Sequence, residues 1–126
     1  MLTAFYFYSM KPEYQVCSFE QAEVLFRLGV LPESLYYFTF FTNSTHQFHL
    51  KPKKYATKLF AHVLGKYGDD SVVEIRSAYN VSELALLLNI EEGPINPFVL
   101  ADQLISKLQN EELRIEDVNE RLLSSV

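Results

Sequence analysis

The chain has 126 residues and a mass of 14.6 kDa, so we expect residues 1–126 to form a single domain. Hydrophobic residues make up 48% and charged residues 21%, which is a globular composition and excludes a disordered, collagen-like or linker-like chain. The net charge of −5 argues against a general nucleic-acid binder. The single cysteine excludes a disulfide framework and multi-cysteine metal or iron–sulfur sites.

The apolar stretches of the sequence do not have the pattern of targeting or membrane segments. Residues 2–9 have no basic residue before them and are too short and too aromatic for a secretory signal. Residues 28–41 are interrupted by Pro32 and Glu33, and neither stretch approaches the roughly 20 apolar residues that cross a bilayer. The sequence therefore favours a soluble, reduced, cytoplasmic protein with no membrane contact.

Aromatic residues are concentrated in the first half of the chain. Thirteen of the 18 lie in residues 1–50, so we expect most of the sheet there, beginning with a strand at residues 2–9. Ser18 and Gln21 then stand at the two positions of a capping box. Apolar residues follow at helical spacing, which predicts a helix that ends near Gly29.

Two aromatic runs, residues 35–42 and 46–51, flank polar turn formers and predict a β-hairpin. Both alternating sets of side chains in the first run are mostly apolar, so this strand requires cover on both faces. The cover is either a second layer of the chain or an interface. Tyr36, Phe38 and Phe40 form one of these sets and are the predicted partner-binding residues, with burial beneath the later helices as the alternative.

The second half of the chain is predominantly helical by its pattern. Pro52 suits the first turn of a helix that runs to about Tyr67, and the glycine and aspartates that follow end it. A short β-branched run at residues 72–76 predicts one more strand. Three shorter helices are then expected, beginning at Asn80 or Ser82, at Pro97 with Asn96 as its cap, and near Ile115.

The order of these elements predicts an α+β fold. Strand, helix, two strands, helix and strand is the ferredoxin-like, or split βαβ, arrangement, with helices on one face of the sheet. Residues 1–78 would form this α+β core, and residues 79–126 would add an all-helical extension. The fold supports many unrelated functions, so the function has to be inferred from particular residues.

Charge is segregated along the chain. Residues 1–33 hold four acids and two bases, and residues 34–68 hold five lysines and no acid. Residues 69–126 hold twelve acids and four bases. The chain therefore has a basic middle and an acidic C-terminal third.

The basic middle is spaced as one helix face, because Lys54, Lys58, His62 and Lys66 stand four residues apart. Such a ridge is suited to phosphates or an acidic protein. It is equally explained as a solvated helix face, or as a face neutralised by the acidic helices of the chain. On the first interpretation the polyanion-binding residues are Lys51, Lys53, Lys54, Lys58 and Lys66.

The acidic C-terminal third also has two interpretations. Several carboxylates precede or begin the last predicted helix, where they stabilise a helix N-terminus. Alternatively, they form an acidic face for a basic partner, as small inhibitor or immunity-type proteins present to nucleases, a likeness of charge and size alone. The residues concerned are Asp102, Glu111, Glu112, Glu116, Asp117 and Glu120.

Catalytic and metal chemistry have few candidates. Cys17 stands directly before the cap of a predicted helix, where backbone N–H groups lower the pKa of a thiol, and its base would have to be His46, His49 or His62. Burial of a small residue at this junction is the favoured alternative.

A metal pair has one candidate. His46 and His49 are three residues apart, and such residues on a strand point to opposite faces. We therefore expect no metal and no cofactor.

The known motifs of phosphate loops, hydrolase triads and zinc proteases do not occur in this sequence. Residues 82–90 have the pattern of the first helix and turn of a helix-turn-helix, but two acids and two prolines follow where a recognition helix would begin. The aromatic strands lack the signature of RNA-recognition motifs.

These observations favour a non-enzymatic regulatory or interaction protein of the inhibitor or immunity type. It would bind a protein partner or a second copy of itself. Nucleic-acid or polyanion binding through the lysines of residues 51–66 is the alternative. An enzyme that uses Cys17 or a histidine ranks third.

Overall fold

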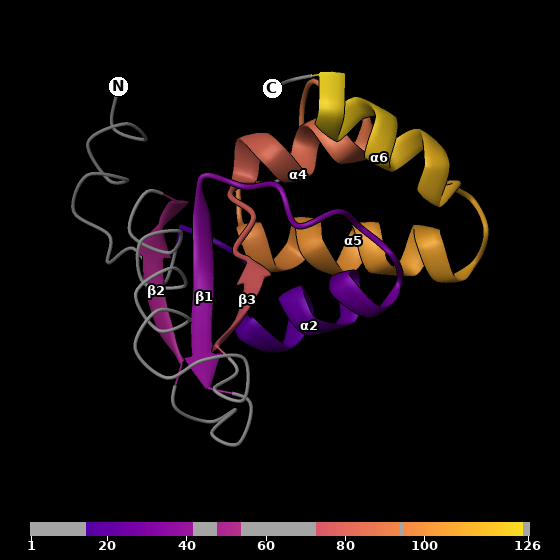
Figure 1. Cartoon of the computed structure of the whole chain (residues 1–126). Helices are drawn as coiled ribbons and strands as arrows, with labels where there is room; N and C mark the ends of the chain where they lie inside the picture. The colour runs from indigo at the N-terminus through magenta and orange to yellow at the C-terminus, as the bar shows by residue number, and fades with distance from the viewer. Residues whose placement is uncertain (1–14, 42–47, 54–72, 94, 125–126) are drawn as a thin grey trace, which may run out of the picture.

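The computed structural model describes residues 15–41, 48–53, 73–93 and 95–124 (Figure 1). These residues form a mixed α+β structure with a three-stranded antiparallel sheet and four helices. In chain order the elements are α2 (Phe19–Arg27), β1 (Tyr36–Phe41), β2 (His49–Pro52), β3 (Val73–Ser77), α4 (Val81–Leu88), α5 (Pro97–Gln109) and α6 (Ile115–Ser124).

The sheet has the order β2-β1-β3, so β1 is its central strand. Phe38 of β1 stands opposite Leu50 of β2 on one side and Arg76 of β3 on the other. The described helices all lie to one side of the sheet in Figure 1. The hairpin that the sequence predicted from its two aromatic runs is confirmed by the antiparallel pairing of β1 with β2.

The described strands do not have the ferredoxin-like order that the sequence predicted. In a split βαβ arrangement, each crossover joins two strands that have another strand between them. Residues 35–42 and residues 72–76 would be the second and fourth strands of this arrangement, and these two strands are not neighbours. Instead, β1 pairs directly with β3. The physical reason is that a strand with two apolar faces is best buried at the centre of a sheet, and element order alone does not encode pairing. The predicted strand at residues 2–9, and the predicted helix beyond Lys53, lie outside the described residues.

The helices begin where short polar side chains cap them. Ser18 accepts a hydrogen bond from the Gln21 backbone at 3.1 Å, and the Gln21 side chain accepts one from the Ser18 backbone at 3.0 Å, which confirms the capping box. Asn80, rather than Ser82, caps α4, and Asn96 caps α5 with Pro97 at its first position. Within the described residues, no helix combines the length and the apolar character that a bilayer crossing requires.

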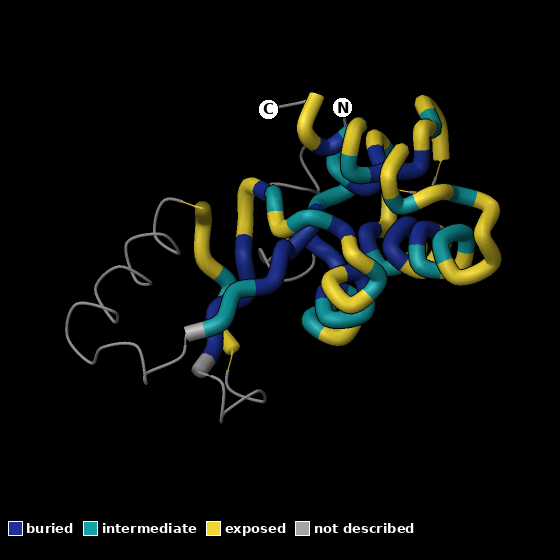
Figure 2. The backbone as a smooth tube through the Cα atoms, turned by 45° about the vertical axis from the view of Figure 1, so that its right-hand side comes forward, coloured by how far each residue is buried: buried dark blue, intermediate teal, exposed yellow. Residues whose placement is uncertain are grey.

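One buried cluster joins the sheet to all four described helices (Figure 2). It contains Leu25 of α2, Phe38 of β1, Leu84 of α4, Leu104 of α5 and Leu122 of α6. Residues before and after position 78 therefore share a hydrophobic core, and the helical extension packs onto the α+β part.

Candidate interaction surface

The start of β1 is fastened to the start of α4 by one carboxylate. Oε1 of Glu83 accepts hydrogen bonds from the Asn80 backbone at 3.0 Å and from the Ser34 hydroxyl at 2.9 Å. Oε2 accepts one from the Leu35 backbone at 3.2 Å. Burial raises the pKa of the Glu83 carboxyl above its usual value, and these three donors partly counteract that effect. Glu83 and its three donors are hereafter the Glu83 cluster, which holds the start of β1 beside the start of α4.

Two cavities adjoin this junction, and Ser82 lines both of them. The first has a volume of about 310 Å³, and the second has a volume of about 340 Å³. The first is lined by Gln15, Val16, Tyr36, Asn80, Val81, Ser82 and Ile95. The second is lined by Glu33, Ser34, Leu35, Lys53, Ser82, Glu83, Leu86 and Leu122.

Large apolar side chains stand exposed around both cavities. Leu35 is 62% exposed, Tyr36 36%, Leu86 39% and Ile95 56%. These four residues are hereafter the apolar surface. Single exposed leucines are common on proteins, but a group of four around adjoining cavities is typical of an interaction site.

The structure divides the three predicted partner-binding residues. Tyr36 belongs to the apolar surface, whereas Phe38 and Phe40 are only 3% and 4% exposed. The ring of Phe19 on α2 meets Phe38 and Phe40 edge to face, with centroids 5.7 and 5.2 Å apart. The burial of these two rings thus needs no partner: Phe19 of α2 contacts both of them, and Phe38 also belongs to the buried cluster that includes residues of the later helices.

The opposite face of β1 is buried as well, as its sequence predicted. Thr39 is 1% exposed and Tyr37 is 4% exposed. The Tyr37 hydroxyl donates to the Pro32 carbonyl at 2.9 Å and accepts from the Ser34 backbone at 3.2 Å. Burial raises the pKa of Tyr37. This strand therefore has cover on both of its faces.

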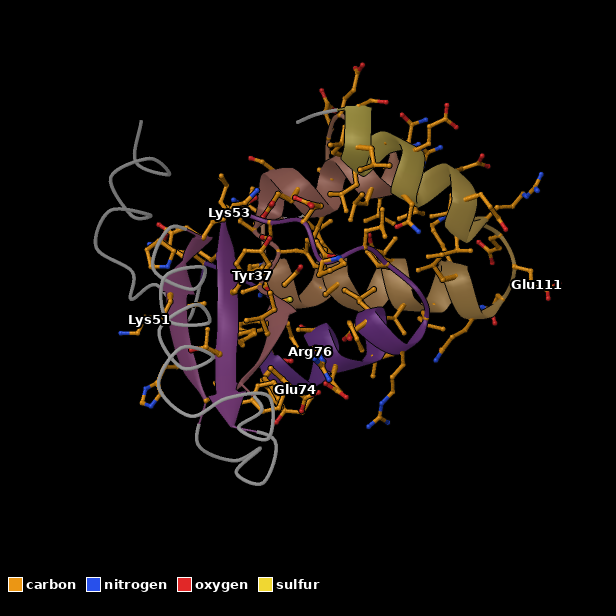
Figure 3. The ribbon with its side chains drawn as sticks, viewed as in Figure 1. Tyr37, Lys51, Lys53, Glu74, Arg76 and Glu111 are labelled. Atoms are coloured by element: carbon orange, nitrogen blue, oxygen red, sulfur yellow. The ribbon has the colours of Figure 1, made fainter. Side chains whose placement is uncertain are left out.

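The predicted polyanion site is described only at its beginning. Lys51 and Lys53 are exposed, and Figure 3 shows Lys51 pointing away from the sheet and Lys53 lying at the end of the sheet near α4. The ammonium of Lys53 lies 3.4 Å from the Glu33 carboxylate. Lys54, Lys58 and Lys66 lie outside the described residues, so this site stays a prediction.

Cys17 has the environment of a core residue. It is 0% exposed, and its backbone donates to the Tyr79 carbonyl at 2.9 Å. Burial raises the pKa of its thiol to about 12, which keeps the sulfur protonated and unreactive at neutral pH. Of its candidate bases, His49 is exposed on β2, and His46 and His62 lie outside the described residues.

The structure also contains an ionic cluster around Arg76 that the sequence pattern does not predict. Arg76 on β3 is 8% exposed, and its guanidinium lies 2.7 Å from Glu23 and 3.3 Å from Glu74. The same group stacks over the ring of Phe26 at 3.9 Å. An arginine in a short strand gives no sequence signal for a partner on α2, which is 53 positions away.

The six carboxylates that the sequence offered as an acidic face, Asp102, Glu111, Glu112, Glu116, Asp117 and Glu120, are exposed, and several already have partners. Asp102 accepts a hydrogen bond from the Gln21 side chain at 2.7 Å. The Glu112 carboxylate lies 3.6 Å from Lys107, and the Glu116 carboxylate lies 3.7 Å from Arg114. These exposed pairs contribute little stability, because water and salt screen them.

A metal site finds no support in residues 15–41, 48–53, 73–93 and 95–124, where no three histidine, cysteine, aspartate or glutamate side chains are close enough to share an ion. Comparison of the chain with protein-family models, with curated proteins and with solved structures gives no match.

Proposed function

We propose that this protein is a non-enzymatic interaction module, which binds a protein partner through the apolar surface of Leu35, Tyr36, Leu86 and Ile95. The observation that carries the proposal is the exposure of these four side chains around two adjoining cavities. Covering them would remove apolar area from water, which is the main driving force of protein association.

The hydrogen bonds of Glu83 and the central position of β1 support the same proposal. The Glu83 cluster holds Leu35 against α4, and Tyr36 lies in the central strand of the sheet. A surface fixed in advance loses little conformational freedom when a partner binds. The regulatory, inhibitor or immunity-type role expected from the sequence is part of this proposal, since such proteins act by occupying a partner.

The test is affinity capture from cell lysate, with and without nuclease, by two matched double variants. Leu35→Gln with Leu86→Gln removes apolar contacts from the surface. Val99→Gln with Leu123→Gln makes the same chemical change at residues that are 41% and 57% exposed and line neither of the two cavities. Urea unfolding first establishes that both variants are folded.

We expect a stoichiometric protein that survives nuclease treatment and is lost from the Leu35/Leu86 variant alone. Equal capture by both variants would contradict the proposal. Loss of everything captured upon nuclease treatment would favour the alternative, polyanion binding through the lysines of residues 51–66.

A further inference from the structure

The cavity beside Leu35 continues across α4 onto α6. Leu86 lines this cavity and also a third one, with a volume of about 430 Å³. The third cavity is otherwise formed by the last helix, through Asp117, Glu120, Arg121 and Ser124. The two cavities that meet at Leu86 are hereafter the acidic groove.

Negative charge is in excess at the α6 end of this groove, where the carboxylates of Asp117 and Glu120 stand beside the single guanidinium of Arg121. Asp117 and Glu120 are exposed, and neither makes an ion pair with a described residue. Of the positive groups that line the groove, Arg121 donates to the Leu87 carbonyl at 2.9 Å and keeps its charge, and Lys53 lies 3.4 Å from Glu33, so the carboxylates outnumber the cations.

The stability of α6 does not account for both carboxylates. Asp117 lies in the first turn of the helix, where it interacts favourably with the helix dipole. Glu120 lies past the middle of α6, where the dipole no longer favours a negative charge. Its carboxylate lines the cavity at Leu86 and is therefore available to a positively charged group that enters there.

We infer that the acidic groove receives an amphipathic helix from a basic partner protein. Apolar side chains of that helix would pack against Leu35 and Leu86, and its lysines or arginines would reach Asp117 and Glu120. This is the helix-in-groove form of recognition, in which an apolar stripe supplies affinity and flanking charges select the partner. The inference rests on the proposed function and adds the chemistry of the partner.

The test uses two synthetic peptides of about 18 residues, which is five helical turns. One has an amphipathic leucine–lysine sequence, and the other has glutamate in place of each lysine. Binding to the full chain is measured by fluorescence anisotropy at several salt concentrations. The charge variant is Asp117→Asn with Glu120→Gln, and its matched control is Glu91→Gln with Glu92→Gln, two exposed acids that line none of the three cavities.

We expect the lysine peptide to bind and the glutamate peptide not to bind. The charge variant should weaken binding about fivefold, as two partly exposed ion pairs would, and added salt should have a similar effect. Leu35→Gln with Leu86→Gln should weaken binding about tenfold or more. The Glu91/Glu92 control should bind like the original protein.

Three outcomes would overturn the inference: no binding of the lysine peptide, equal loss in the Glu91/Glu92 control, and equal binding of both peptides. If the two peptides bind equally but depend on Leu86, the proposed interaction surface stands and the basic partner is wrong. If capture depends on Leu35 and Leu86 but the captured protein is a second copy of this chain, the proposed interaction surface again stands and the basic partner is wrong. If neither peptide binds and capture also fails, both proposals are wrong.

Discussion

Glu83 offers a sharp test because two opposing effects meet at its carboxyl group. Three hydrogen-bond donors favour the charged form, whereas burial disfavours it, and burial has the larger effect, so the pKa is raised. Replacement of Glu83 by glutamine keeps an acceptor for Asn80 and Ser34. It also places an amide N–H₂ opposite the Leu35 N–H, where Oε2 now accepts at 3.2 Å.

We expect Glu83→Gln to lower the free energy of unfolding by about 1 kcal/mol at neutral pH, because the hydrogen bond from Leu35 is replaced by two opposed N–H groups, and relief of the charge desolvation offsets part of that loss. Glu83→Ala should cost about 2–3 kcal/mol, because the Asn80 and Ser34 hydrogen bonds are lost as well. Ser34 keeps the Ala78 carbonyl as an acceptor at 3.2 Å, which limits the loss.

The pH dependence gives the decisive measurement. Because the folded pKa of Glu83 lies above the unfolded one, the folded state binds this proton more tightly. The stability that protonation contributes is fully present below the unfolded pKa, about 4.3, and is lost as pH rises through the folded pKa. Urea unfolding at neutral pH and at about pH 4 should therefore show the Glu83 protein gaining stability relative to Glu83→Gln on acidification. A difference that shrinks on acidification would refute the reasoning, because it would mean that the hydrogen bonds outweigh burial.

Three further predictions concern the interior. Cys17 should react with a thiol reagent only as fast as the chain unfolds, and rapid stoichiometric labelling of the folded protein would contradict its burial. Arg76→Met should cost about 2 kcal/mol by removing the 2.7 Å partner of Glu23, which keeps Arg27 at 3.3 Å. Adding Glu23→Gln should restore part of this loss in urea unfolding, and no recovery would mean that Arg76 and Glu23 are not coupled. Gln21→Ala should lower the free energy of unfolding by about 2 kcal/mol, and Ser18→Ala by about 1 kcal/mol. The difference is expected because the Gln21 side chain also donates to Phe98 and Asp102 of α5. Equal losses in the two variants would contradict this prediction.

Local signals in the sequence predicted local structure well. The capping box at Ser18, the cap at Asn96 and the polar residues between two aromatic runs each specify a conformation within a few residues, and the structure has the helices and the hairpin that they predict. The pairing of β1 with β3 was not predicted, because it joins segments more than 30 positions apart. Hydrophobic pattern indicates that a strand is buried but not which strand lies beside it.

Of the residues of the candidate surface, the sequence proposed only Tyr36 for partner binding, and this role stays a prediction. Alternation along the strand could not show that Phe19 would cover Phe38 and Phe40. Leu35, Leu86 and Ile95 come from three separate segments, and the sequence pattern singles out none of them. Their common exposure follows from tertiary packing, which a one-dimensional pattern does not contain.

Asn119 of α6 has a consequence for the order in which the chain can fold. Its side chain accepts from the Leu31 backbone at 2.9 Å and donates to the Gly29 carbonyl at 3.0 Å, across 88 and 90 positions of sequence. Val118 and Leu122 on the same helix complete the core. A nascent chain therefore cannot close its core on the ribosome until residues 115–124 have left the exit tunnel. Until then, the segment between α2 and β1 lacks a partner that is translated about 90 positions later, so premature termination before α6 should yield a chain that is held by chaperones or degraded.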